Sequence, residues 1–255
     1  MSNILAIAQK ELKAYFASPI AYVTIGFFAL LYGYFYAVGL AFFVRQSMQM
    51  GQFGGGQAVN INQMMIRNVV QNVTILVLFL MPMVTMRTYA EEKRSGTIEL
   101  LLTSPLTDFE IIMGKFLGAF ALYAVMLLVT TLHIGLLFVY GRPEWKPIIS
   151  AYVGLLLMGG CFISAGLFIS SLTRNQIVAV MATFAVFLFL WVINWIGTFS
   201  GPEVEKLTSY LSIVEHFDDF SKGVIDTTHV IYYVSFITFG LFLTAKSVDS
   251  ERWRS

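Results

Sequence analysis

The sequence predicts an all-α integral membrane protein with six transmembrane helices, and two observations carry this prediction: the composition and the placement of the charges. Of the 255 residues, 57% are hydrophobic and 12% are charged, and the mean hydropathy is +0.74. A soluble domain carries about 25% charged residues. Because 16 basic and 15 acidic side chains cannot cover a water-soluble globule of this length, we exclude that class of protein.

Six runs of the sequence contain no Asp, Glu, Lys or Arg, and each is long enough to cross a bilayer, which takes about 20 mostly apolar residues. A charge at the bilayer centre costs about 3 kcal/mol, so this partition is typical of spanning helices. The strands of a β-barrel would alternate in polarity, whereas these runs are continuously apolar. Residues 1–255 are predicted to form one transmembrane domain, with spans at residues 20–44, 68–86, 116–141, 147–173, 175–202 and 227–245.

Residues 1–19 predict an amphipathic helix that lies along the membrane interface. On a helical wheel its apolar side chains share one arc, opposite Gln9, Lys10 and Lys13. The dipeptide Ser18-Pro19 ends this helix before the first span. The alternative is that these residues are only the start of the first span. The apolar arc consists of Ile4, Leu5, Ala8, Leu12, Tyr15 and Phe16.

The distribution of Lys and Arg predicts that both termini are cytoplasmic. Ten of the 16 basic residues lie on the side that holds the termini and residues 87–115, and six lie on the other side. Cytoplasmic segments carry the excess of positive charge. On the outer side, the glycines at 51 and 54–56 predict a mobile first half of residues 45–67. Residues 203–226 predict one or two short helices that dip into the outer leaflet, because apolar residues recur there near helical spacing.

Residues 87–115 connect the second and third spans and hold the most specific pattern in the chain. Ile98, Leu101 and Leu102 follow helical spacing, and this helix cannot extend through Pro105. A capping box of Thr107 and Glu110 starts the next helix. The segment is therefore predicted to form a helix, a proline turn and a second helix.

The apolar face of the first of these helices has two explanations. Either it rests on lipid, or it docks a cytoplasmic partner, with the three apolar side chains as anchors in a groove of that partner. In the second case Glu91, Glu92 and Glu99 form a polar rim around the anchors. The spacing of the residues does not separate the two.

The energy for any uphill transport must come from outside this chain. The spans hold no Asp, Glu, Lys or Arg, and their histidines are His133 and, near the start of the last span, His229, whereas ion-coupled carriers keep ionisable groups inside the bundle. The nucleotide-binding pattern G-x-x-x-x-G-K-[ST] is also missing, because the Gly114-Lys115 pair continues into Phe116. A separate nucleotide-hydrolysing subunit that docks on residues 87–115 would meet both needs.

An intramembrane enzyme or metalloprotein is the competing class of protein. We expect the histidines His133, His216 and His229 to be far apart, and no H-E-x-x-H pattern is present. His216, Asp218 and Asp219 would be the ligands of an outer metal ion, but a solvated acidic loop is the favoured interpretation, and we predict no metal site. His133 is interpreted as a hydrogen-bonded helix-packing residue rather than a proton carrier.

The run AEEKRSGTIELLLTSPLTDFEIIMGKFLGAF resembles the hallmark of type 2 ABC exporter permeases, and within them the gliding-motility-associated permeases. The resemblance extends over nearly the whole chain, because SLTRNQ at residues 171–176 and HFDDFSKGVID at residues 216–226 are similar to the same subfamily. It implies a plasma-membrane transport subunit of a bacterium, which is not an enzyme and binds no cofactor and no nucleic acid.

The resemblance also implies partners and contact residues. A second permease copy or a relative would complete the substrate path, and a cytoplasmic ABC ATPase carrying ATP and Mg would sit under each permease, with a periplasmic accessory subunit as an optional addition. A second, smaller contact with the ATPase would involve Arg174 and Asn175. The cytoplasmic coupling helix that receives the ATPase movement would consist of Glu91, Glu92, Gly96, Thr97, Ile98, Glu99, Leu101, Leu102 and Pro105.

Two functions are therefore expected from the sequence. The first is the permease subunit of an ATP-driven exporter. The alternative is a partner-regulated membrane channel or scaffold that uses the same docking helix without pumping, and a secondary carrier is a distant third. The first function requires a stoichiometric ATPase whose hydrolysis responds to the permease.

Overall fold

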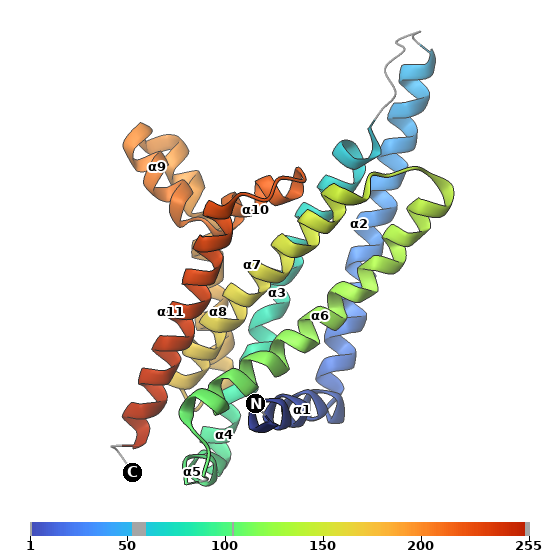
Figure 1. The fold of residues 1–255 in the computed structure, drawn as a ribbon. Coiled ribbons are helices and arrows are strands. Elements are labelled where there is room, and N and C mark those ends of the chain that lie inside the picture. Colours follow the sequence, from blue (N-terminus) through green and yellow to red (C-terminus); the bar gives the residue numbers. More distant parts are fainter. Residues whose placement is uncertain (1, 53–59, 104, 253–255) are drawn as a thin grey trace.

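Helices make up the regular structure in the described part of the chain, which comprises residues 2–52, 60–103 and 105–252 of a computed structural model (Figure 1). A π-helical turn, η1 (Asn62–Ile66), precedes α3. The predicted all-α class is confirmed. The helices are α1 (Ser2–Ala17), α2 (Pro19–Gln52), α3 (Arg67–Thr85), α4 (Arg87–Ser95), α5 (Thr97–Leu102), α6 (Asp108–Tyr140), α7 (Trp145–Leu172), α8 (Gln176–Ser200), α9 (Pro202–Leu211), α10 (Ile213–Ser221) and α11 (Thr227–Arg252).

Six stretches of helix in the described residues are long and apolar enough to cross a membrane: α2, the η1–α3–α4 stretch, α6, α7, α8 and α11. The prediction of six candidate membrane-spanning helices is therefore confirmed. The helices α2, α6 and α11 extend past their uncharged runs, because a helix ends where its backbone is capped and not at the first charge, whereas α8 lies inside its run. The mobile segment predicted from residue 45 is wrong as far as Gln52, where α2 continues. Residues 54–56 lie outside the described residues.

The centre of the bundle is formed by α3 and α7. In the most apolar window of each of these helices 67% of the residues are buried, against 17% in α2 and α11. The glycines of α7 allow this close packing. A Cβ at Gly159 would overlap the Tyr123 ring of α6, and one at Gly166 would overlap Thr85 of α3. The Tyr123 ring is held in place, because its hydroxyl donates a hydrogen bond to the Leu155 carbonyl oxygen at 2.8 Å.

The two ends of the bundle differ in what they carry. Figure 1 places α1, α4, α5 and the end of α11 at one end, and α9 and α10 at the opposite end. The short helices α9 and α10 occupy most of residues 203–226, where one or two short helices were predicted. We call the end that holds α1, α4, α5 and the end of α11 the terminal end, and the opposite end the α9–α10 end.

The N-terminal helix α1 packs on α6, and its buried face is offset from the predicted apolar arc. Ile7, which the arc did not include, is 8% exposed, whereas Leu5 is 63% exposed. Two glycines of α6 explain the offset. A Cβ at Gly114 would lie 2.5 Å from the Ile7 Cβ, and one at Gly118 would lie 2.6 Å from the Glu11 Cβ. Only glycine at both positions lets the two helices approach this closely.

Candidate partner-docking site

The predicted docking segment is built as a rigid extension of the central helix α3. Only Met86 separates α3 from α4, and its backbone is helical, with its N–H donating to the Pro82 carbonyl oxygen. Gly96 then ends α4 in the left-handed conformation, at φ 74°. A Cβ at Gly96 would meet no atom within 4 Å, so the backbone conformation and not crowding favours glycine there.

The root of α4 is attached to α7 through Ser170. Its hydroxyl oxygen accepts hydrogen bonds from the backbone N–H groups of Tyr89 and Ala90 at 3.2 and 3.1 Å. The same hydroxyl donates to the Met86 carbonyl oxygen at 3.0 Å. One side chain thus satisfies three backbone groups at the junction where α3 becomes α4, and fixes that junction against the centre of the bundle.

A buried lysine joins three helices at the terminal end. The Lys115 side chain on α6 is 1% exposed, and its Nζ lies 3.0 Å from Glu11 Oε1 on α1 and 2.8 Å from Glu92 Oε1 on α4. The same Nζ donates to the Thr88 carbonyl oxygen at 2.9 Å. All three N–H donors of the ammonium group therefore have acceptors. We call Lys115, Glu11 and Glu92 the lysine cluster.

The lysine cluster holds α1, α4 and α6 together more strongly than an exposed ion pair would. Its carboxylates are 14% and 17% exposed, so water screens them little. One lysine faces two carboxylates, and Glu92 Oε2 is buried without a hydrogen-bond partner among the described residues. Removing the cation would leave two buried like charges next to each other, which would strongly destabilise the contact between these three helices.

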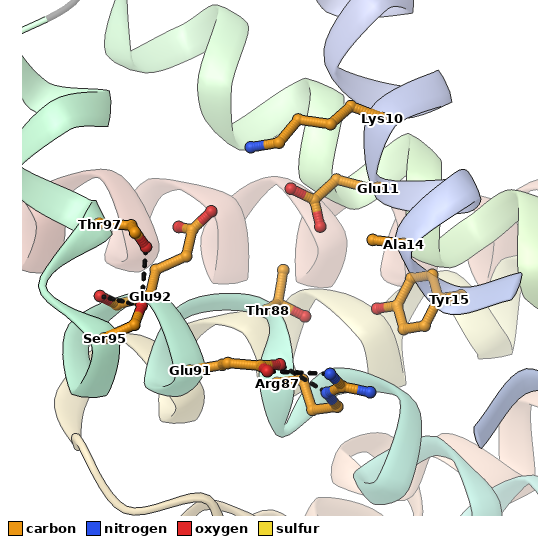
Figure 2. A pocket seen from close by; sticks show the side chains of 10 residues that line it. All are labelled: Lys10, Glu11, Ala14, Tyr15, Arg87, Thr88, Glu91, Glu92, Ser95 and Thr97. Atoms are coloured by element: carbon orange, nitrogen blue, oxygen red, sulfur yellow. Dashed lines mark hydrogen bonds and ion pairs between the residues drawn. The ribbon is translucent and has the colours of Figure 1, made fainter. Parts of the chain in front are cut away.

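A pocket of about 300 Å³ opens between α1 and α4 beside the lysine cluster (Figure 2). Arg87 forms a two-pronged ion pair with Glu91 in its wall, at 2.6 and 2.9 Å. Lys10, Glu11, Ala14 and Tyr15 of α1 form one wall, and residues from Arg87 to Thr97 form the other.

The predicted contact residues divide into exposed and internal ones. Gly96, Thr97, Glu99 and Pro105 are exposed at the turn and on α5. Ile98, interpreted as an anchor for the partner, is 8% exposed and belongs to the core of this chain.

Four other predicted contact residues do not offer a described free side chain: two form ion pairs within the chain, and the side chains of the other two are not described. Glu91 binds Arg87 and Glu92 binds Lys115, so neither is a free rim residue. The backbone of Leu101 and Leu102 belongs to α5, but the structure does not describe their side chains. Leu100 is 73% exposed and is the apolar side chain that α5 offers outward. The helical spacing did not single it out, because it predicted the opposite face.

The predicted second contact, Arg174 and Asn175, forms the turn between α7 and α8. Arg174 is exposed. The Asn175 side chain caps α8 by accepting a hydrogen bond from the Ile177 N–H at 2.9 Å. Asn175 thus has a structural role that its sequence position did not reveal.

The α9–α10 end brings together residues that were treated as separate. His216 and His229 are in contact, with 2.7 Å between their Nδ1 atoms, so the interpretation of distant histidines is wrong for this pair. Asp218 binds Arg67 of α3 at 2.7 Å and Lys222 at 2.6 Å. Among the described residues, no group of three or more His, Cys, Asp or Glu is placed to hold a metal ion.

His133 lies between α6 and α2, where its ring contacts those of Tyr32 and Tyr36 edge-on at 5.3 and 5.2 Å between centroids. Its Nδ1 is buried and has no hydrogen-bond partner among the described residues. These contacts agree with the interpretation of His133 as a helix-packing residue. The hydrogen bond that this interpretation also expects is missing at Nδ1 among the described residues.

Comparison with known proteins gives two findings. A family described as "ABC-2 family transporter protein" matches residues 5–246. Two curated relatives, both described as "Probable multidrug ABC transporter permease YbhR", come from Escherichia coli strain K12 and E. coli O157:H7, and each is 29% identical over 147 residues. The matched segment covers 55% of this chain and 38% of each relative.

Proposed function

Because the chain belongs to the ABC-2 family of transporter proteins, a family of membrane transport subunits, we propose that it is the permease subunit of an ATP-driven exporter. A separate cytoplasmic ATPase docks at the terminal end of the bundle, and a second permease copy or a relative completes the substrate path. This assigns the terminal end to the cytoplasm and the α9–α10 end to the outer side of a bacterial inner membrane. The segments at residues 171–176 and 216–226 favour the gliding-motility-associated subfamily.

The lysine cluster is the observation that carries this proposal. A movement imposed from outside reaches the spans only if the element that receives it is rigidly joined to them. Lys115 ties α4 and α1 to α6, and Ser170 ties the start of α4 to α7. A push on α5 therefore moves the ends of several spanning helices together. A helix that only rested on lipid would not need these buried attachments.

The outward side chains of α5 provide the contact with the ATPase. Leu100 is 73% exposed and stands next to the exposed Glu99, so the described side chains of α5 include an apolar and an acidic group that face outward. An apolar anchor with a charged neighbour is a common arrangement in helix-in-groove recognition. Ile98 packs on the inner side of α5, in the hydrophobic core of this chain.

The proposal is tested by placing a charge on this anchor. In cells that co-express the tagged full chain and its ABC-type ATPase, Leu100→Asp is expected to lower ATPase co-purification and transport-linked ATP hydrolysis by at least tenfold. Leu207→Asp is the matched control, because Leu207 is 61% exposed on α9 at the opposite end. Unchanged ATPase recovery with Leu100→Asp would contradict the docking site. A bound ATPase whose hydrolysis never responds to the permease would favour the channel or scaffold alternative.

A further inference from the structure

Two histidines meet where α10 faces the start of α11. Nδ1 of His216 lies 2.7 Å from Nδ1 of His229. The other ring nitrogens have partners as well. Nε2 of His216 is 2.9 Å from the Tyr210 carbonyl oxygen, and Nε2 of His229 is 3.0 Å from Asp219 Oδ2. These contacts form one continuous chain of hydrogen bonds that connects α9, α10 and α11.

The two ends of this chain determine how many protons it holds. A backbone carbonyl oxygen only accepts hydrogen bonds, and so does an ionised carboxylate. Nε2 therefore carries a hydrogen in both rings. The contact between the two Nδ1 atoms needs a third hydrogen, because two lone pairs at 2.7 Å repel each other. Two neutral imidazoles have two N–H hydrogens in total, so the pair holds one extra proton and one positive charge.

The surroundings supply the hydrogen-bond acceptors of this charged pair. His216 is 5% exposed, and its burial lowers its pKa. The carboxylate of Asp219 accepts a hydrogen bond from His229, which holds the Asp219 pKa below its usual value and keeps this acceptor ionised. The pair thus donates one hydrogen to the Asp219 carboxylate and one to the Tyr210 carbonyl oxygen, and it holds the third between its two Nδ1 atoms.

We propose that His216 and His229 form a proton-binding site that fastens α10 to α11 while it holds a single proton. Loss of that proton in alkaline solution leaves one of the three hydrogen bonds without a hydrogen. A second proton in acid places two N–H groups against each other. The hydrogen-bonded contact between α10 and α11 is therefore intact only between an alkaline limit and an acidic limit of pH. This inference does not rest on the proposed ATPase partner.

Carboxylates predominate around the pair and favour retention of the proton. The ring of Tyr232 stacks on His216, with 3.8 Å between centroids, and shields it from water. The packed helix α8 carries no titratable side chain. The titratable and charged groups that surround the pair are Tyr210 of α9, Glu215, Asp218 and Asp219 of α10, Lys222 and Asp226 of the connection between α10 and α11, Tyr232 and Tyr233 of α11, Cys161 of α7, and Arg67 of α3.

A metal ion is the competing occupant, because metal-binding histidines also engage their second nitrogen with a carboxylate or a carbonyl oxygen. Zinc–nitrogen bonds of about 2.0–2.1 Å in a tetrahedral site would hold the two nitrogens about 3.3 Å apart. The observed 2.7 Å is shorter and fits an N–H···N hydrogen bond. The geometry therefore favours the proton.

The proposal is tested by nuclear magnetic resonance of the full chain labelled with ¹⁵N-histidine, which contains three histidines. Near neutral pH we expect scalar coupling across the hydrogen bond between the Nδ1 atoms of His216 and His229. His229→Gln should abolish this coupling, and His133→Gln, the matched control, should retain it. In a titration the coupling should disappear at both the acidic and the alkaline extreme.

A second variant leaves both histidine rings in place, so its result does not depend on whether His229→Gln folds. Asp219→Asn removes the ionised acceptor, and the alkaline limit of the coupling should then move to lower pH. Two histidines that titrate independently, with no coupling at any pH, would overturn the proposal. So would stoichiometric binding of added Zn²⁺ at micromolar concentration to the two Nδ1 atoms of chelator-treated protein, because it would identify the pair as metal ligands.

Discussion

At the scale of single residues, the stability of the terminal end depends on one buried charge. Lys115 lies almost completely out of water, which is costly for an ammonium group unless every donor has an acceptor. Glu11, Glu92 and the Thr88 carbonyl oxygen supply these acceptors. The lysine is therefore a positioning residue. It contacts no substrate or nucleotide in the proposed function, but it sets the place of α1 and α4 relative to α6.

Replacing this lysine should be among the most damaging single changes in the chain. Lys115→Met is expected to destabilise the protein by about 3–5 kcal/mol, because it leaves two buried carboxylates uncompensated. Lys10→Met changes an exposed lysine on α1 and should stay within about 0.5 kcal/mol. Unfolding of both purified full-length variants in the same detergent measures the difference.

Removal of all the charges provides the control for this prediction. The triple variant Lys115→Met, Glu11→Gln and Glu92→Gln should recover a large part of the lost stability, because no unpaired buried charge is left. If Lys115→Met proved as stable as Lys10→Met, the lysine cluster would not hold the helices together.

At the scale of elements, the docking segment consists of a rigid helix and a short one joined at a single point. α4 follows the central span α3 through the helical residue Met86, and the left-handed backbone of Gly96 then leads the chain into α5. The Ser95 and Thr97 hydroxyl oxygens lie 2.8 Å apart across this turn and reinforce it. The exposed face of α5 therefore keeps a fixed direction relative to α4, which a docking element requires.

The conformation of Gly96 predicts a graded response to substitution. Gly96→Ala should weaken the turn by about 1–2 kcal/mol, because a residue with a Cβ is strained in the left-handed region. Gly96→Asn should cost less, since asparagine adopts this region more readily. Hydrogen exchange of the α4–α5 amides in the full chain measures the effect. Equal protection in both variants would show that backbone strain does not control this turn.

At the scale of the whole molecule, burial separates the central spanning helices from the outer ones, and α6 lies in between, with 39% of its most apolar window buried. The centre consists of α3 and α7, whereas α2, α8 and α11 bury less than a quarter of their most apolar windows within this chain. Large apolar side chains such as Phe42, Phe189 and Phe239 are exposed on these outer helices, so their surfaces must face lipid or another protein. Both ends of the described chain lie at the terminal end together with the docking segment (Figure 1).

This arrangement predicts which positions share a side of the membrane. Cys161 is the only cysteine in the sequence and is buried, so Cys161→Ala gives a background for single-cysteine labelling. In inside-out vesicles an impermeant thiol reagent should label Lys13→Cys and Leu100→Cys but not Leu207→Cys. In right-side-out vesicles the pattern should reverse. Labelling of Lys13→Cys and Leu100→Cys from opposite sides would refute the shared end.

Local patterns predicted those parts of the structure that depend on neighbours in the sequence. The uncharged runs identified six candidate spans, because the cost of burying charge acts on each segment by itself. Thr107 and Glu110 form the predicted capping box, with both reciprocal hydrogen bonds present. Residues 203–226 contain two short helices, as the apolar spacing indicated.

Patterns that depend on distant partners were misread. Helical spacing assigned Ile98 to a partner's groove, but the side chain packs inside this chain, because spacing identifies an apolar face without saying what covers it. Glu92 was placed on a polar rim, since nothing nearby in the sequence predicts that Lys115 of a different helix reaches it. A lysine at the start of an apolar span was the available signal for a buried partner.

The amino-acid sequence alone determined that this chain is helical and crosses a membrane, because apolar length and the positions of charges are properties of each segment. Only the tertiary structure decided which charges are buried together and which side chains remain free for a partner. The lysine cluster joins residues from three helices, and the histidine pair joins two, so their meeting depends on how the helices pack. Packing brings together groups from separate segments, and no single segment encodes the distance between such groups.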